Sequence, residues 1–175
     1  VMAPEPSFVM YKQIAQCLGL NYQGLPLLAD SFDLNLPVLL ESIKIQQPAI
    51  IFLAYPNNPT GNLFDVEAIK EIITAAPGLV ILDEAYAPFT DATFMAELPN
   101  YKNLLVMRTV SKLGLAGLRL GFIAGDHQVI EELNKVRLPY NINSLTQCST
   151  EFALSQPEMF AEQTTILRNE RARVF

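Results

Sequence analysis

One segment of the sequence, residues 108–121, places an amine, two hydroxyls and, besides Arg108 at its start, a guanidinium close together. The amine belongs to Lys112, the hydroxyls to Thr109 and Ser111, and the guanidinium to Arg119. The segment follows an apolar run and surrounds the lysine with small residues, so we expect the amine to be poorly solvated. Desolvation favours the neutral amine, the form that a Schiff-base lysine needs. The hydroxyls alternate along an extended segment and could bind an anionic group together with the guanidinium.

Two further polar clusters follow apolar runs. Asp83 comes directly after residues 79–82, where an unpaired carboxylate would be costly, so we expect it to have a cationic partner. Tyr86 stands three residues later, and Asn58 lies in a turn at 55–61 whose prolines and glycine fix the backbone. The alternatives are an ordinary turn at the asparagine, and a helix cap or a structural ion pair at the aspartate.

Together these side chains offer complementary functions for a single cofactor. They supply an amine for an aldehyde, an acid for a ring nitrogen, donors for a phenolic oxygen and a cradle for a phosphate. Neither a Walker loop nor a GxGxxG motif is present in the sequence, which argues against a nucleotide-binding α/β domain. The single histidine, His127, leaves no multi-histidine metal centre, and we predict no metal site.

The elements that must position these residues can be read from hydrophobic periodicity. Short apolar runs predict buried strands at residues 49–54, 79–82, 104–107 and 120–124. Between them lie amphipathic helical patterns, one capped by Asp65 over residues 66–75 and one opened by Asp126. Alternating strands and helices need crossover connections, so we predict an α/β fold with a mostly parallel sheet flanked by helices. The polar clusters would then meet at the carboxyl edge of that sheet.

Composition argues against several classes of protein. The chain has 175 residues, of which 50% are hydrophobic, as in one ordinary globular domain. Its formal net charge of -6 and its dispersed basic residues argue against a nucleic-acid partner. No apolar run approaches the roughly 20 residues that span a bilayer, so we expect a cytoplasmic protein without a membrane partner. Cys17 and Cys148 show no CxxC spacing and are predicted to be buried free thiols.

The order and spacing of the motifs resemble the fold-type I, class I/II aminotransferases, which use pyridoxal 5'-phosphate (PLP). The resemblance rests on Asn-Asn-Pro-Thr-Gly at 57–61, Asp-Glu-Ala-Tyr at 83–86, and Ser-Lys with a following Gly/Ala run and arginine at 111–119. It implies that Lys112 carries PLP as a Schiff base and, once released, moves the proton between the substrate Cα and the cofactor. Asp83 would keep the pyridine nitrogen protonated.

The same resemblance assigns the remaining cofactor contacts. Asn58 and Tyr86 would donate hydrogen bonds to the phenolic oxygen. Phe8 would stack on the ring, although a core residue at the start of a helix is the alternative interpretation. The phosphate would be held by Thr109, Ser111 and Arg119. This arginine stands seven positions after the lysine, one fewer than is usual in the family.

Within the family, three segments resemble the histidinol-phosphate aminotransferases: Arg-Thr-Val-Ser-Lys at 108–112, Leu-Ala-Gly-Leu-Arg-Leu-Gly at 115–121 and Pro-Tyr-Asn at 139–141. The implied function is transamination of L-histidinol phosphate with 2-oxoglutarate in histidine biosynthesis, by a homodimer. An aminotransferase of the aromatic or alanine type, or a PLP-dependent amino-acid decarboxylase, would use the same lysine, aspartate and tyrosine. A non-catalytic domain descended from such an enzyme is the alternative of another class.

The resemblance also predicts how the chain divides. Residues 1–155 would form the core of the large PLP-binding domain, and residues 156–175 would begin the helix that leads to a small domain. Because members of the family are much longer, we expect a partial chain that has little or no transaminase activity by itself.

Overall fold

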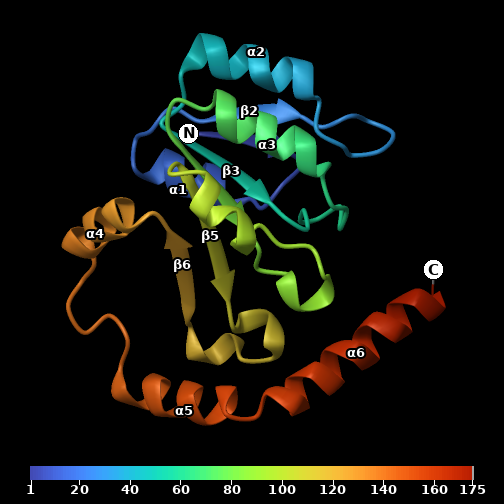
Figure 1. Cartoon of the computed structure of the whole chain (residues 1–175), viewed down its shortest axis with the longest axis vertical. Coiled ribbons are helices and arrows are strands. Elements are labelled where there is room, and N and C mark those ends of the chain that lie inside the picture. The colour runs from blue at the N-terminus through green and yellow to red at the C-terminus, as the bar shows by residue number, and fades with distance from the viewer. Residues whose placement is uncertain (175) are drawn as a thin grey trace.

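The computed structural model describes residues 1–174 and contains a six-stranded sheet with helices on both faces (Figure 1). The strand order is β2-β1-β3-β4-β5-β6, and every neighbouring pair is parallel except β5 and β6. The prediction of a mostly parallel α/β fold is therefore confirmed. The strands are β1 Met2–Glu5, β2 Gln23–Pro26, β3 Ile50–Ala54, β4 Leu79–Asp83, β5 Leu104–Thr109 and β6 Gly121–Gly125.

The four strands predicted from apolar runs are β3 to β6, each within two residues of its expected bounds. The strands β1 and β2 were missed because they are only four residues long and their sequences contain Pro4, Gly24 and Pro26. Their register, in which Met2 pairs with both Gln23 and Ile51, shows that tertiary pairing rather than local pattern forms them.

Both predicted helices form, α3 between β3 and β4 and α4 after β6, but short 3₁₀ turns rather than helices connect β4 to β5 and β5 to β6. Asp65 caps α3 by accepting a hydrogen bond from the N–H of Ala68, and Asp126 caps α4 through the N–H of Gln128. Within residues 1–174, no helix is both long enough and apolar enough to cross a membrane. The helices are α1 Met10–Cys17, α2 Leu36–Gln46, α3 Val66–Ala75, α4 His127–Val136, α5 Ser144–Leu154 and α6 Pro157–Val174, with short 3₁₀ turns η1 Ala87–Phe89, η2 Met95–Asn100, η3 Ser111–Leu113 and η4 Ala116–Leu118.

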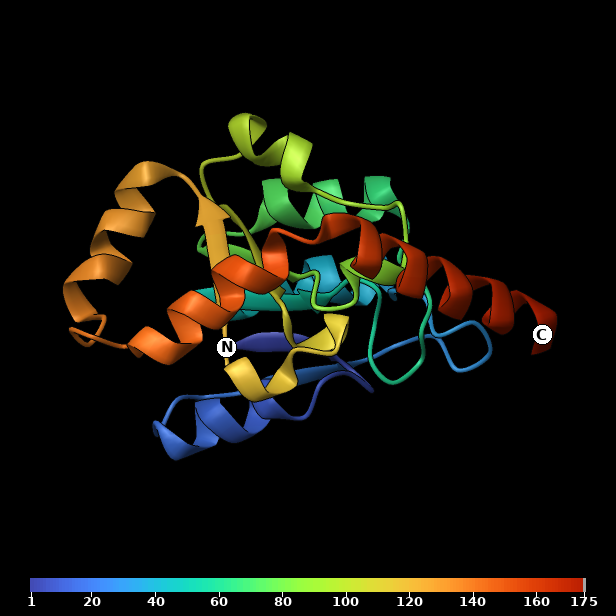
Figure 2. The ribbon, with the colours of Figure 1, turned by 90° about the horizontal axis from the view of Figure 1, so that it is seen from below.

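The two faces of the sheet are covered unequally. Figure 2 shows α1 on one side of the sheet, together with the η3–η4 loop, and α3 on the other. The main core lies on the side of α2 and α3, where Ile43 and Ile72 pack with Leu53, Leu82 and Leu104, all of them almost completely buried. The opposite face holds a smaller cluster around Ala3, Tyr11 and Ala54. The thinly covered face is therefore the one with room for a ligand.

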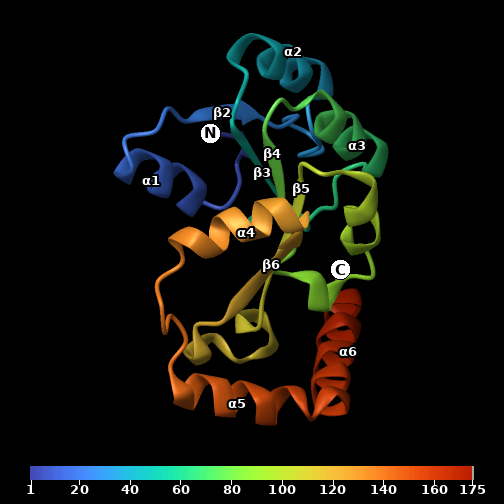
Figure 3. The same ribbon diagram turned by 60° about the vertical axis from the view of Figure 1, so that its left-hand side comes forward.

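α4 lies beside the last residues of β6, and α5 and α6 then pass the loop end of the β5–β6 hairpin (Figure 3). α5 contacts η4, and α6 contacts η1. A two-pronged ion pair between Arg168 and Asp91, with N–O distances of 3.0 and 2.7 Å, joins α6 to the segment after β4. The division at residue 155 stays a prediction, and residue 175 of the predicted 156–175 segment lies outside the described residues.

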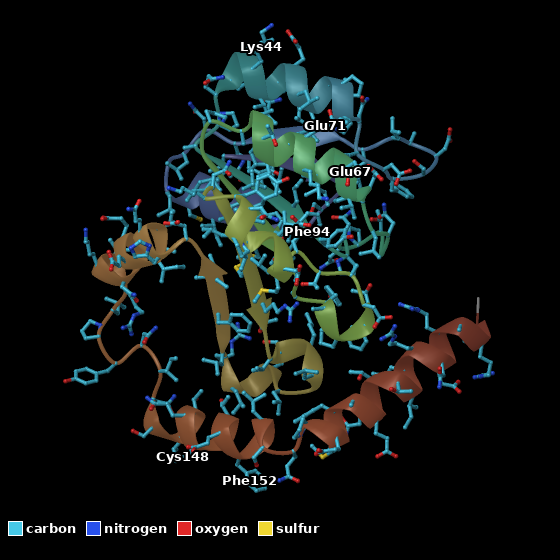
Figure 4. All side chains as sticks on the ribbon, in the orientation of Figure 1. Lys44, Glu67, Glu71, Phe94, Cys148 and Phe152 are labelled. Atoms are coloured by element: carbon cyan, nitrogen blue, oxygen red, sulfur yellow. The ribbon has the colours of Figure 1, made fainter. Side chains whose placement is uncertain are left out.

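The prediction that both cysteines are buried is wrong, because both thiols are exposed. On α1 the inward positions are taken by Tyr11 and Ala15, which leaves Cys17 on the outer face. Figure 4 shows Cys148 and Phe152 on the side of α5 that points away from the sheet. Apolar periodicity located these helices, but it did not show which of their faces the chain covers.

Gly78 provides a test of the packing between β3 and β4. A Cβ atom at this position would overlap the backbone carbonyl of Ala49, which a side-chain rotation cannot relieve. We expect Gly78→Ala to lower the free energy of unfolding by about 1–3 kcal/mol, measured by urea denaturation. The control is Gly117→Ala, since a Cβ atom there meets no described atom within 4 Å. Equal stabilities for the two variants would contradict the packing described.

Candidate active site

A small cavity of about 50 Å³ lies at the carboxyl ends of β3 and β4, on the thinly covered face. It continues into a hollow of about 800 Å³ that shares Pro56, Asn58 and Tyr86 with it. Convergence of polar side chains, rather than size, marks the cavity as the site. Its wall is formed by Phe8, Tyr11, Ala54, Pro56, Asn58, Asp83, Ala85, Tyr86 and Lys112, which include five of the predicted site residues.

Asp83 is the buried acid of this cavity and is only 8% exposed. Its Oδ2 accepts a hydrogen bond from the Tyr11 hydroxyl at 2.7 Å, and its Oδ1 accepts one from the N–H of Ala85 at 3.0 Å. Burial raises the pKa of Asp83, while these two hydrogen bonds and the positive charge of Lys112 oppose the rise. The expected cationic partner is not in contact: a hydroxyl occupies its place. Each carboxylate oxygen can still accept a further donor.

Lys112 reaches the same cavity from the η3 turn that follows β5. Its side chain is exposed, so the prediction of a desolvated amine is wrong. The small residues Gly114, Ala116 and Gly117 are themselves exposed and leave the lysine uncovered. The ammonium lies 5.1 Å from the centre of the Tyr86 ring, a cation–π distance that holds it over the cavity. The structure therefore places an accessible amine beside a buried acid.

The turn after β3 contains two asparagines with different environments. Asn57 is buried: its side-chain amide accepts from the Ser7 hydroxyl and donates to the Pro6 carbonyl and the Thr60 hydroxyl, at 2.7–3.0 Å. Asn58 instead lines the cavity. The first asparagine thus fixes the turn to the segment before α1, and the second presents its amide. The resemblance to the family singled out Asn58, whereas the local sequence pattern did not distinguish it from Asn57.

The aromatic residues at the start of α1 form a second wall. Phe8 is 40% exposed, which rules against the alternative of a core residue. Its ring meets Tyr11 edge to face at 5.5 Å, and Tyr11 stacks on Phe52 at 4.5 Å. Sequence reasoning missed Tyr11 entirely. Its place three residues after Phe8, in the first turn of α1, was the available signal.

The predicted phosphate cradle is only partly assembled. The hydroxyl of Thr109 donates to that of Ser111 at 2.8 Å, so these side chains do lie together as expected. Arg119 is exposed, and its guanidinium donates to the carbonyl of Ala116 at 3.2 Å. Within residues 1–174, no hydrogen bond links the arginine to either hydroxyl. A phosphate role for the three residues stays a prediction.

The cationic partner expected for Asp83 belongs instead to its neighbour Glu84. Successive side chains of a strand point to opposite faces, so Glu84 enters the main core, where it is fully buried. Arg108 of β5 donates to it from Nε at 3.0 Å and from Nη2 at 2.7 Å. The Thr93 hydroxyl and the N–H of Phe94 complete its shell. This pair ties β4 to β5 behind the cavity.

Comparison with known proteins defines the class. The family model for aminotransferase class I and II matches residues 1–175, and the chain belongs to this family. It is 59% identical over 174 residues to histidinol-phosphate aminotransferase 2 of Nitrosococcus oceani, covering 99% of this chain and 48% of the relative. It is 52% identical to the histidinol-phosphate aminotransferase of Chromobacterium violaceum, covering 99% and 49%. The chain thus spans about half the length of the relatives it matches.

Solved structures show the same fold. The histidinol-phosphate aminotransferase of Sinorhizobium meliloti, solved in complex with PLP, superposes with a TM-score of 0.88 at 24% identity, over 99% of this chain and 48% of that one. The L-threonine-O-3-phosphate decarboxylase of Porphyromonas gingivalis gives 0.75 at 22% identity, over 91% and 48%. At these identities the likeness establishes the fold-type I architecture and nothing finer.

The ion pair behind the cavity can be tested by removing one partner. Arg108→Met leaves the buried Glu84 carboxylate without its cation, and we expect a loss of about 3 kcal/mol in the free energy of unfolding. Adding Glu84→Gln to this variant should recover part of the loss, because the uncompensated charge disappears. As a control, Lys135→Met breaks an exposed pair with Glu132 and should change stability by less than about 1 kcal/mol. If the loss of stability in the double variant equals the sum of the losses in Arg108→Met and Glu84→Gln, the two side chains are not energetically coupled.

A second test concerns the cost of ionising Asp83. Because burial raises its pKa in the folded protein, ionisation destabilises the fold fully above that raised pKa and not at all below the ordinary value. We expect Asp83→Asn to leave the cofactor-free protein at least as thermally stable at neutral pH, with any gain vanishing in acid. The exposed Asp33→Asn serves as control. A neutral-pH melting temperature that falls in the first variant alone would refute this.

Proposed function

We propose that the complete protein containing this chain catalyses PLP-dependent transamination, with L-histidinol phosphate as amino donor and 2-oxoglutarate as acceptor in histidine biosynthesis. The observation that carries the proposal is the convergence of the Lys112 amine and the buried Asp83 carboxylate on one cavity. The names of the relatives at 59% and 52% identity support the choice of substrate.

The residues of the cavity fit PLP. A buried carboxylate with acceptor capacity left suits a ring N–H, and an exposed aromatic face on Phe8 suits a flat ring. An amine held over the Tyr86 ring at the same cavity suits an aldehyde. When bound, PLP supplies that aldehyde and a protonated ring that takes up electrons from the substrate.

Each side chain then has a defined task. Lys112 would hold the cofactor covalently and, after release, its amine would carry a proton between the substrate Cα and the cofactor. Asp83 keeps a proton on the ring nitrogen. Asn58 and Tyr86 donate to the phenolic oxygen, and Phe8 covers one ring face. The phosphate is assigned to Thr109, Ser111 and Arg119.

The same proposal extends to the whole protein. Residues 1–155 form the large PLP-binding core, and residues 156–175 begin the helix toward a small domain. We also propose a homodimer located in the cytoplasm. The ion pair of Arg168 with Asp91 supports a fixed direction for that helix relative to the cavity.

The first test is chemical labelling of the complete protein. After incubation with PLP and borohydride reduction, we expect peptide mapping to find one pyridoxyl group per chain, on Lys112. Lys112→Ala should abolish the label, whereas Lys102→Ala, at a polar turn far from the cavity, should retain it. Label scattered over several lysines would argue against the site.

The reaction itself is tested by its products. Formation of glutamate from L-histidinol phosphate and 2-oxoglutarate supports transamination, with turnover lost to background in Lys112→Ala. Release of carbon dioxide from an amino acid would favour a decarboxylase instead, and neither product from a labelled protein would favour a non-catalytic domain.

A further inference from the structure

The hydrogen bond between Tyr11 and Asp83 joins two distant parts of the chain inside the cavity wall. The donor lies on α1 and the acceptor at the end of β4, and the O–O distance is 2.7 Å. Tyr11 is 5% exposed and Asp83 is 8% exposed, so water does not compete with the bond. Hydrogen bonds from a hydroxyl to a carboxylate are short and strong under such conditions.

The electrostatics fix which partner carries the proton. Burial and the neighbouring Asp83 charge both raise the pKa of Tyr11 far above its ordinary value, so the phenol stays protonated and remains the donor. The same bond lowers the pKa of Asp83 and opposes the effect of burial. Tyr11 therefore favours the ionised carboxylate.

The ring of Tyr11 is held from two sides. Phe52 stacks on it with planes 7° apart and centres 4.5 Å apart, and Phe8 meets it edge to face at 83°. The direction of the hydroxyl is therefore set before any ligand binds. Phe8 is the residue proposed to cover the face of the cofactor ring, and Asp83 is the one proposed to bind the ring nitrogen. Tyr11 therefore contacts both of these residues.

We propose that Tyr11 is a positioning residue: its hydroxyl holds Asp83 ionised and correctly oriented for the cofactor's pyridine nitrogen. This inference rests on the proposed function. The groups facing Asp83 are the hydroxyl from α1, the N–H of Ala85 after β4 and the ammonium of Lys112 from η3. Beyond Tyr11 lie Tyr22 and Glu5, which do not hydrogen-bond to the aspartate.

The test removes a single oxygen. Tyr11→Phe keeps the ring and its stacking but deletes the donor. The control is Tyr22→Phe, the same change in a tyrosine that packs against the same small cluster without bonding to Asp83. The measurement is an NMR titration of the cofactor-free complete protein labelled with ¹³C-aspartate, in which Asp83→Asn assigns the Asp83 signal. We expect the titration midpoint of the Asp83 carboxyl group to rise in Tyr11→Phe and not in Tyr22→Phe.

In the PLP-loaded protein we expect kcat to fall by about tenfold in Tyr11→Phe with KM little changed, as for loss of one hydrogen bond to a charged group. The pH dependence of the cofactor absorption should shift with it, which a purely structural role would not produce. An unmoved Asp83 midpoint overturns the inference, as does a moved midpoint with unchanged kcat. Failure of the wild-type protein to take PLP on Lys112 would instead remove the proposed function, and with it the cofactor role of Tyr11.

Discussion

Two adjacent carboxylates, Asp83 and Glu84, are buried at the end of one strand, and much of the site follows from how each is stabilised. The alternation of a β-strand sends them to opposite faces of the sheet. Glu84 enters the main core and is neutralised by Arg108, two hydrogen bonds from one guanidinium. Within residues 1–174 the hydrogen bonds to Asp83 come from two neutral donors, the Tyr11 hydroxyl and the Ala85 N–H, so the carboxylate can still interact with a positive group.

The unequal coverage of the two faces of the sheet fits the different environments of Asp83 and Glu84. Helices α2 and α3 cover one face with a continuous apolar core, which gives the site the rigid support that it requires. On the other face α1 is short and contributes Tyr11 and Ala15 as its buried residues. Stability is concentrated on one side of the sheet, and the polar side chains that would bind a cofactor gather on the other.

The sequence predicted the fold class and the central strands because apolar runs and helix caps such as Asp65 are local signals. It also placed Lys112, Asp83, Tyr86 and Asn58 together, because parallel strands end at one edge. It could not predict β1 and β2, whose pairing depends on distant partners. Among the described residues Asp83 makes no ion pair, so the alternative of a structural ion pair is not supported and its cofactor role stays a prediction. The predicted burial of Lys112 was wrong because exposure depends on how far the η3 turn projects from the sheet.

The reversal of direction at β6 has an evolutionary consequence. Because β6 is antiparallel to β5, the lysine segment is a hairpin connection rather than a crossover, and its base is closed where Thr109 pairs with Gly121. The Val110 N–H also donates to the Leu120 carbonyl at 3.2 Å. A loop anchored at both ends of a hairpin can lose or gain a residue while the strands stay in register. The seven-residue step from Lys112 to Arg119 is thus a length variant that the sheet can tolerate.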